Sequence, residues 1–295
     1  MRIALVTCDS LRPEEQDDRP FQAALAARGV HVTSPAWTDP AVDWAAFDAA
    51  LIRTTWDYAP RLPAFLDWAA RAAAATRLWN PLPVIRWNTD KRYLAAFAAA
   101  GIPIAPTAWV PARATTRLAD VLAAHGWARA LVKPVVGAGA SDCRVVTAPA
   151  SPADEAFFAE ALTRVGLLVQ PYLPSVESEG EVSLILVDEV PCHGVRKRPR
   201  PGDFRVQDEH GAADEPWSPE AEALAIARAA HAIARPWSGT DAPLLVSRVD
   251  LLRLPDGRWC LNELEAVEPS LFFRHGPATA GVLADALLAR LRAAV

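Results

Sequence analysis

Three acidic residues near the carboxyl end of the chain are spaced so that they could share one site. The composition of Pro255-Asp256-Gly257, between two runs of alternating apolar residues, predicts the turn of a β-hairpin. A two-residue turn or a four-residue loop would place Asp250 opposite Glu263, and Glu265 would share a strand face with Glu263. A three-residue loop with a glycine bulge would instead pair Asp250 with Asn262. We favour the even-length loops, which bring three carboxylates to one patch.

The chemistry of such a patch depends on what offsets its charge, because opposed carboxylates destabilise a sheet. Hard oxygen ligands in this number suit Mg²⁺, which typically binds one or two carboxylates together with substrate phosphates. Two alternatives stay open at this point. The acids could lie on a solvated sheet face and pair with Arg248 or Arg253, or two of them could act as a general acid and base.

The lysines are a second unusual feature. Of the 30 basic residues only three are lysines, which are Lys91, Lys133 and Lys197. A lysine ammonium is a compact point charge, whereas an arginine guanidinium is a wide planar fork. Lysines that persist in an arginine-rich chain therefore indicate a narrow pocket for an anion such as phosphate, with three solvated surface lysines as the alternative. All three also lie at the ends of predicted elements, where binding sites gather.

A loop of small residues begins four positions after Lys133. It consists of Gly137, Ala138, Gly139, Ala140 and Ser141. Small residues let backbone N–H groups approach phosphate oxygens, and Lys133 would add positive charge beside them. The segment matches neither the GxxxxGK[ST] phosphate loop nor a GxGxxG turn after the first strand. An ordinary β-turn is the alternative interpretation.

The overall composition limits the classes of function. A formal net charge of −5 gives no basic field that would attract nucleic acid or an anionic membrane. Although 52% of the 295 residues are hydrophobic, no apolar run approaches the roughly 18–20 residues of a membrane span. The four cysteines are scattered without a CxxC pair, which favours free thiols and a cytoplasmic location. The six histidines show no metal-ligand spacing.

Residues 1–88 predict a small parallel sheet with helices on its faces. The predicted strands span 3–7, 30–33 and 50–54, and the predicted helices span 21–28 and 63–75. Open α/β sheets bind ligands at the carboxyl ends of their strands, so Asp9, Ser10 and Arg53 are candidate substrate contacts. We interpret Trp56, which follows the third strand, as a core residue.

The rest of the chain predicts two further units. Strands are expected at 107–110, 129–134, 144–147, 167–170, 181–197 (a hairpin), 244–253 and 258–264, and helices at 90–100, 118–125, 152–164, 219–234 and 277–293. Residues 198–219 are rich in proline, glycine and charge, which predicts a long loop. Loops of this length are usually functional lids or disordered segments.

These residues, in this order, resemble the ATP-grasp superfamily, in particular the glutathione-synthetase-like ligases, over nearly the whole chain. The resemblance implies an α/β fold with an N-terminal Rossmann-like substrate domain at 1–88. It also implies two α+β lobes, at 89–172 and 173–295, that enclose ATP. The second lobe would carry the lid and the metal site.

The resemblance also assigns residues to the nucleotide. Lys91 and Lys133 resemble the two nucleotide lysines of the superfamily, and the loop 137–141 is similar to the one that covers the phosphates. Glu181 lies near the position that holds the ribose. The hinge that reads adenine corresponds to Gln170, Pro171, Tyr172 and Leu173.

Further positions match the reacting end of the site. Lys197 and Arg205 match basic residues beside the phosphates, where they would act in catalysis. Arg248, also a catalytic candidate, and Ser270 lie next to the expected metal ligands and are candidates for binding a substrate carboxylate, which a guanidinium fork suits.

The acidic hairpin resembles the metal-binding set of these ligases. Asp250, Glu263 and Glu265 correspond to an Asp…Glu-x-Asn pattern that holds two Mg²⁺ ions. Glu265 stands where the pattern has asparagine, which adds a negative charge to the site.

Four stretches are most similar to a subgroup that includes the D-cycloserine-forming cyclo-ligases, which close O-ureido-D-serine into a ring. These stretches are residues 86–93, 197–207, 248–250 and 263–270. The resemblance implies an ATP- and Mg²⁺-dependent ligase that activates a small-molecule carboxylate as an acyl phosphate for an amine-type nucleophile, releasing ADP and phosphate. We expect no nucleic-acid or membrane partner, and possible assembly as a homodimer.

Three other functions remain open from the sequence. One is a non-catalytic ATP-binding module, which the retention of three lysines and three acids disfavours. A second is a ligase that modifies a peptide or protein terminus, for which Arg196, Arg198 and Arg200 would supply a basic groove. The third is a metal-dependent hydrolase built on the acidic patch, which nucleotide binding would distinguish from the others.

Overall fold

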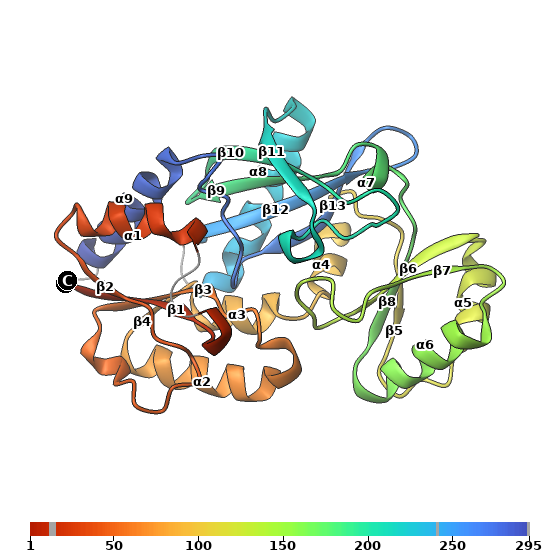
Figure 1. The fold of residues 1–295 in the computed structure, drawn as a ribbon, viewed down its shortest axis with the longest axis horizontal. Coiled ribbons are helices and arrows are strands. Elements are labelled where there is room, and N and C mark those ends of the chain that lie inside the picture. Colours follow the sequence, from red (N-terminus) through yellow and green to blue (C-terminus); the bar gives the residue numbers. More distant parts are fainter. Residues whose placement is uncertain (12–15, 240–241, 294–295) are drawn as a thin grey trace.

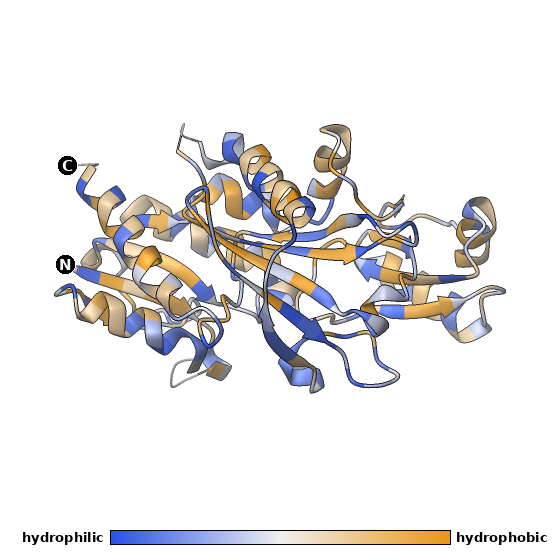
Figure 2. Ribbon diagram, turned by 90° about the horizontal axis from the view of Figure 1, so that it is seen from above, coloured by the Kyte–Doolittle hydropathy of each residue, from blue (hydrophilic) through white to orange (hydrophobic). Residues whose placement is uncertain are grey.

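In the part of the chain that the structure describes, three β-sheets form the framework (Figure 1). The computed structural model describes residues 1–11, 16–239 and 242–293. Hydrophobic residues, orange in Figure 2, run along many of the strands, whereas blue hydrophilic residues occur at strand ends, in loops and on parts of the helices. The α/β architecture expected from the sequence is confirmed. The exact domain boundaries after residues 88 and 172 stay predictions.

The N-terminal sheet is parallel throughout, as the sequence predicts. Its strand order is β2-β1-β3-β4, and its bounds are β1 (Arg2–Thr7), β2 (His31–Thr33), β3 (Ala49–Thr54) and β4 (Arg77–Trp79). Two amphipathic helices accompany these strands, α1 (Arg19–Ala26) and α2 (Leu62–Ala75). Proline in the first turn of each helix fits the fixed φ that a helix start requires.

The second sheet is antiparallel and lies on the far side of the molecule from the first (Figure 1). Its strands follow the order β5-β8-β6-β7, with bounds β5 (Ala108–Val110), β6 (Arg129–Pro134), β7 (Arg144–Thr147) and β8 (Leu167–Pro171). The helices α5 (Leu118–His125) and α6 (Pro152–Arg164) pack beside it. A capping box between Ser151 and Asp154 fixes the start of α6.

The third sheet has five antiparallel strands in the order β11-β10-β9-β12-β13. Their bounds are β9 (Glu181–Val187), β10 (Val190–Arg198), β11 (Ala213–Trp217), β12 (Val246–Arg253) and β13 (Trp259–Glu265). Helices α8 (Ala221–Ala234) and α9 (Ala278–Ala293) cover it, and the short α7 (Ser175–Ser178) precedes β9.

The central strand β9 is buried on both faces and joins two hydrophobic cores. Leu184 and Leu186 point into the core beneath α8, whereas Ile185 and Val187 share a core with β1 and α9. Because alternate side chains leave a strand in opposite directions, a strand apolar at every position must be covered twice. This strand therefore attaches the third sheet to the N-terminal sheet.

The segment 198–219 differs from the predicted loop. Residues 213–217 form the edge strand β11, in which Asp214 pairs with Lys197 of β10. The sequence of β11 is polar and contains Pro216, which an edge strand tolerates because one of its sides needs no ladder hydrogen bonds. Its polar composition hid the strand, and only residues 199–212 connect β10 to β11.

The predicted helix at 90–100 also differs, because it begins later. Helix α3 (Leu82–Asn88) ends before Lys91, and α4 (Tyr93–Ala99) begins after it. Lys91 therefore lies in the turn between two helices, where its backbone N–H donates to the carbonyl of Val135 at 2.7 Å. Asn88 does not cap α4, since its side chain binds strand β13 instead.

No helix within the described parts of the chain is long and apolar enough to cross a membrane.

Candidate active site

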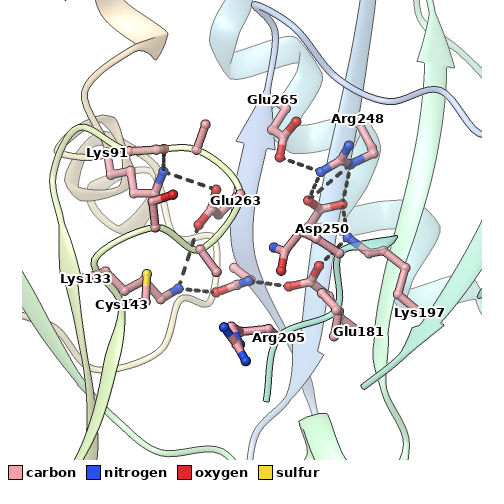
Figure 3. Close-up of a pocket in the computed structure, with 18 of the residues that line it drawn as sticks. Lys91, Lys133, Cys143, Glu181, Lys197, Arg205, Arg248, Asp250, Glu263 and Glu265 are labelled. Carbon is pink, nitrogen blue, oxygen red and sulfur yellow. Dashed lines mark hydrogen bonds and ion pairs between the residues drawn. The ribbon is translucent and has the colours of Figure 1, made fainter. Parts of the chain in front are cut away.

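A cavity of about 620 Å³ opens where the three sheets meet. Most residues that the sequence assigned to a nucleotide, a metal or catalysis line this cavity. They are Lys91, Lys133, Gly137, Ala138, Gly139, Ala140, Ser141, Gln170, Pro171, Tyr172, Leu173, Glu181, Lys197, Arg205, Arg248, Asp250, Glu263, Glu265 and Ser270. Figure 3 shows the lysines and acids of this set facing one another across the cavity.

The hairpin β12–β13 places its acids in the predicted register by an unexpected route. Near the turn the strands pair as the three-residue loop requires, which is the alternative that we disfavoured. Arg253 lies opposite Trp259. A bulge beside Asp250 then shifts the pairing by one residue, so that Asp250 lies opposite Glu263 as predicted. The even-length loop was therefore wrong, but the pairing of the acids is confirmed because β13 contains one extra residue.

Asn262 was missed by the sequence analysis, although it lines the cavity beside Glu263. Its side-chain oxygen accepts a hydrogen bond from Lys133 Nζ at 2.9 Å, and its amide nitrogen donates to Glu181. Alternation along a regular strand would put Asn262 on the face opposite Glu263. The bulge removes that alternation, and nothing in the sequence marks it.

Glu263 is the acid that faces the two nucleotide lysines. Its carboxylate oxygens lie 3.4 Å from Lys91 Nζ and 3.8 Å from Lys133 Nζ. Lys91 also donates to the carbonyl of Gly137 at 2.9 Å, which ties the small-residue loop to the turn between α3 and α4. Although burial raises the pKa of Glu263, the two lysines lower it further, so the net direction is down.

A second ion-pair group lies on β9, β10, β12 and β13. Arg248 holds Asp250 with two hydrogen bonds, Nε to Oδ1 at 2.9 Å and Nη2 to Oδ2 at 2.8 Å, and it also contacts Glu265. Lys197 Nζ lies 3.5 Å from Asp250 and pairs with Glu181. Burial opposes the charge on Asp250, but Arg248 and Lys197 hold the pKa of that carboxyl well below its usual range.

The pKa of Glu265 is shifted in the opposite direction to that of Asp250. Burial raises its pKa to about 7, and the neighbouring charges of Asp250 and Glu263 add to the rise. Arg248, which pairs with Glu265, opposes this rise. A cation delivered with a ligand would favour the charged carboxylate further.

The acids fit magnesium in chemistry, but they do not form a complete cage. Their hard carboxylate oxygens are the donors that Mg²⁺ prefers, and Asp250 and Glu263 are neighbours across the hairpin. Within residues 1–11, 16–239 and 242–293, however, no three His, Cys, Asp or Glu side chains could hold a metal ion by themselves. The three carboxylates do lie on one patch, but each pairs with a basic side chain in this structure: Glu263 with Lys91, and Asp250 and Glu265 with Arg248 (Figure 3). The assignment of these acids to Mg²⁺ stays a prediction.

Two loops meet at one wall of the cavity. In the small-residue loop, Gly139 has φ of 61°, and a Cβ there would lie 2.8 Å from Glu209 Oε1. His210 Nε2 lies 3.1 Å from the carbonyl of Gly139. The left-handed backbone conformation favours glycine at this position. The side chain of Glu209 and the ring of His210 bring the segment 199–212 against this loop.

Side chains of α3 and α4 hydrogen-bond the backbone of β13 and hold it in position. The side chain of Asn88 donates to the carbonyl of Leu264 at 2.8 Å and accepts from the N–H of Ala266 at 2.7 Å. The hydroxyl of Tyr93 accepts from the N–H of Leu264 at 3.1 Å. These contacts lie on both sides of Glu265 in the sequence, so α3 and α4 fix the strand that carries the acids.

The predicted substrate contacts of the N-terminal sheet are placed differently. Arg53 is buried outside the cavity, where Nη2 donates to Asp18 at 2.7 Å and Nη1 donates to the carbonyl of Pro269 at 3.1 Å. Asp9 and Ser10 are exposed and do not line the cavity either. The strand ends do reach it through Trp56, which is exposed and corrects our core interpretation.

Other cavity residues gave no signal in the sequence. Cys143 lies beside Lys133 in Figure 3, and burial raises the pKa of its thiol to about 11, so it stays a neutral thiol at neutral pH. Glu268 and Phe272 line the cavity from the segment after β13. Only the fold brings this segment back over the hairpin.

Comparisons with known proteins agree with this geometry. The family model for the N-terminal domain of the D-cycloserine synthetase DcsG matches residues 3–80. The cycloserine biosynthesis protein DcsG of Streptomyces lavendulae is 35% identical over 301 aligned positions, which cover 98% of this chain and 99% of that protein. This chain belongs to the DcsG family.

Solved structures of DcsG and of another ligase have the same fold as this chain. The crystal structure of D-cycloserine synthetase DcsG matches with a TM-score of 0.90 and 33% identity, covering 99% of this chain and 100% of that one. The ATP-grasp ligase PsnB, solved with a minimal precursor, Mg and ADP, matches with a TM-score of 0.63 and 18% identity, covering 98% of both chains. The expected ATP-grasp fold is confirmed, and this DcsG-family chain is an ATP-dependent ligase.

Proposed function

We propose that the chain closes O-ureido-D-serine into D-cycloserine, with ATP converted to ADP and phosphate. The relationship to DcsG at 35% identity over the full length supports the substrate. The observation that carries the proposal is the cavity itself, in which three buried or half-buried lysines face a row of acids. A site that binds a nucleotide phosphate chain together with Mg²⁺ needs charges of both signs at close range.

ATP would occupy the side of the cavity nearer the second sheet. Lys91 and Lys133 are placed to neutralise phosphate oxygens, and the backbone of 137–141 to donate N–H groups to them. The segment 170–173 lines the cavity from the end of β8, where its backbone would read the adenine. In this arrangement the phosphates would displace the present contacts of the lysines with Glu263.

Magnesium would be held by Asp250, Glu263 and Glu265 together with the phosphates, and we propose two ions. The bound metal would supply neutralising positive charge at the transferring phosphoryl group. Arg248 now pairs with Asp250 and Glu265. Its side chain would therefore have to move partly away from these acids when Mg²⁺ and ATP bind. Lys197 and Arg205, which also line the cavity, would add positive charge.

The reaction would begin when a carboxylate oxygen of the substrate attacks the γ-phosphorus of ATP and ADP leaves. The product of that step is an acyl phosphate. The ureido nitrogen that is bonded to oxygen would then attack the carbonyl carbon, and phosphate would leave with the former carboxylate oxygen. The ring formed in this way would still carry the carbamoyl group on that nitrogen. Attack of water on the carbamoyl carbon would release this group as carbamic acid, which breaks down to CO₂ and ammonia, and would leave D-cycloserine. Arg248 and Ser270 are placed to hold the carboxylate, so the chain contributes mainly positioning and charge neutralisation.

The segment 199–212 would cover the reacting groups and exclude water, which would otherwise hydrolyse the acyl phosphate. The contact of His210 with the carbonyl of Gly139 supports a position of this segment beside the phosphates. A peptide-terminus ligase is less well supported. Arg198 pairs with Glu215, and Arg196 donates to the carbonyl of Glu179, so these arginines are already engaged.

Product analysis tests the proposal. The purified chain, ATP, Mg²⁺ and O-ureido-D-serine should yield ADP and D-cycloserine in equal amounts, identified by mass and chiral chromatography. O-ureido-L-serine and peptides with free carboxyl termini should give little ADP. Release of ADP without a cyclic product, or none with O-ureido-D-serine, would overturn the assignment.

A further inference from the structure

Glu268 differs from the other buried acids of the cavity. It lines the cavity with only 9% of its surface exposed. Asp250, Glu181 and Glu263 each lie within ion-pair distance of a lysine or arginine. Among the described residues, no basic side chain lies within ion-pair distance of Glu268.

The surroundings of Glu268 hold it in place without neutralising it. The hydroxyl of Tyr58 lies next to the carboxyl group and interacts with it. Trp56 Nε1 donates to the backbone carbonyl of Glu268 at 3.0 Å, and Arg53 donates to that of Pro269 at 3.1 Å. Burial raises the pKa of Glu268 to about 8, and the nearby charge of Glu265 adds to the rise.

We propose that Glu268 binds the α-ammonium group of the substrate amino acid. This inference rests on the proposed function, because it takes an α-amino acid as the substrate. A buried carboxylate without a cation is costly, and a ligand that brings the cation removes the cost. Phosphate is excluded as the partner of this position, since two anions would repel one another.

The position of Glu268 in the chain supports the same ligand. It lies two residues before Ser270, whose backbone carbonyl accepts a hydrogen bond from Arg248 at 3.2 Å. The carboxylate and ammonium groups of an α-amino acid are attached to one carbon atom, so their subsites must be adjacent. Trp56 and Tyr58 line the same part of the cavity, and an aromatic face is a favourable neighbour for an ammonium group.

The turnover test compares two substrates that differ only in the ammonium group. These are O-ureido-D-serine and 3-(ureidooxy)propanoate, assayed by ADP release. Glu268→Gln retains an oxygen that accepts from Tyr58, so it removes the charge with little change of shape. We expect kcat/KM for O-ureido-D-serine to fall about 10- to 100-fold, mainly through KM, and that for the deamino compound to stay within about threefold.

A matched substitution controls for the loss of a charge as such. Glu222 is exposed in the first turn of α8, remote from the cavity lining. Glu222→Gln should leave both substrates unaffected. If Glu268→Gln instead lowered kcat equally for both compounds with KM unchanged, Glu268 would be acting as a general base or a structural residue, and the ammonium subsite would be wrong.

A binding test separates this inference from the proposed reaction. D-serine should raise the unfolding temperature of the wild type more than 3-hydroxypropanoate does, and Glu268→Gln should abolish that difference. The result does not depend on turnover. Absence of ADP release with O-ureido-D-serine would overturn the reaction alone, whereas an unchanged D-serine preference in Glu268→Gln would overturn the subsite alone.

Discussion

Lys133 Nζ lies 2.9 Å from the side-chain oxygen of Asn262, so a strand of the second sheet is hydrogen-bonded to a strand of the third across the cavity. Asn262 in turn donates to Glu181 on β9. A lysine that is only 8% exposed is thus held in a narrow polar gap. The ammonium group of Lys133, which we propose binds the phosphates, is therefore oriented before the nucleotide binds. The site is preorganised in this respect.

Replacing this lysine by arginine tests whether the gap requires a point charge. The planar guanidinium of Lys133→Arg keeps the charge but is wider than the ammonium and needs several partners in one plane. We expect kcat/KM for ATP to fall by about 30-fold or more, corresponding to a lost charged hydrogen bond of about 2 kcal/mol. Steady-state ADP release at saturating amino-acid substrate measures this. Wild-type kinetics in a normally folded variant would show that only charge matters here.

The proposed role of Glu263 in magnesium binding can be tested directly by substitution. Glu263→Gln is close to isosteric but removes the charge that faces Lys91 and Lys133, and we expect turnover to fall at least about 100-fold. Raising Mg²⁺ should recover part of the loss if the side chain acts as a ligand. Circular dichroism should match that of the wild type. Normal turnover at low Mg²⁺ would remove Glu263 from the metal set.

Arg274 joins three acids that come from different parts of the chain. It lies 3.3 Å from Asp17, 2.8 Å from Asp208 and in contact with Asp214 of β11. Arg274→Met keeps the length but not the charge, so the segment 199–212 should open more often. We expect faster trypsin cleavage within that segment, and a higher KM for ATP.

A matched arginine controls for the change of charge. Arg228 is exposed on α8, and Arg228→Met should leave both the cleavage rate and the KM unchanged. Equal cleavage rates in Arg274→Met and the wild type would show that Arg274 does not hold the segment down.

His231 makes the stability of the fold depend on pH. It is buried beneath β12, with Nδ1 2.7 Å from the hydroxyl of Ser247. Burial lowers its pKa from the ordinary value of 6.5 to about 4. The unfolded chain therefore binds the proton more tightly, so the free energy of unfolding is retained above pH 6.5 and falls as the pH drops toward 4.

From pH 7 to pH 5 we expect this residue to cost about 2 kcal/mol of unfolding free energy, measured by urea denaturation. His231→Gln should be less stable at pH 7 but lose less between the two pH values. His31→Gln, at an exposed position, should follow the wild type. An equal pH dependence in all three proteins would exclude His231 as the titrating group.

Much of the framework was predictable because local patterns determine it. The run of small residues after Lys133, the helix that starts at Pro152 and the turn at Gly257 all depend on side chains within a few positions. Their elements appear at or near the predicted bounds. Strand β11 could not be found in the same way, because an edge strand gains its hydrogen bonds from a neighbour and needs no apolar pattern.

The sequence predicted which residues form the site, but it did not predict the contacts between them. The types and order of the lysines and acids indicated which residues gather. The bulge at Asn262 and the burial of Arg53 against Asp18 depend on tertiary packing, which leaves no periodic trace in the sequence. Glu268 was overlooked for the same reason, since its isolation is a property of the cavity wall.

The most direct test of the account follows one oxygen atom. O-ureido-D-serine labelled with ¹⁸O in its carboxylate is converted with unlabelled ATP, and the released phosphate is analysed by mass spectrometry. Activation as an acyl phosphate predicts that one ¹⁸O atom passes into each phosphate, because the carboxylate oxygen that attacked the γ-phosphorus leaves with it. Phosphate free of the label, formed together with D-cycloserine, would contradict the proposed mechanism.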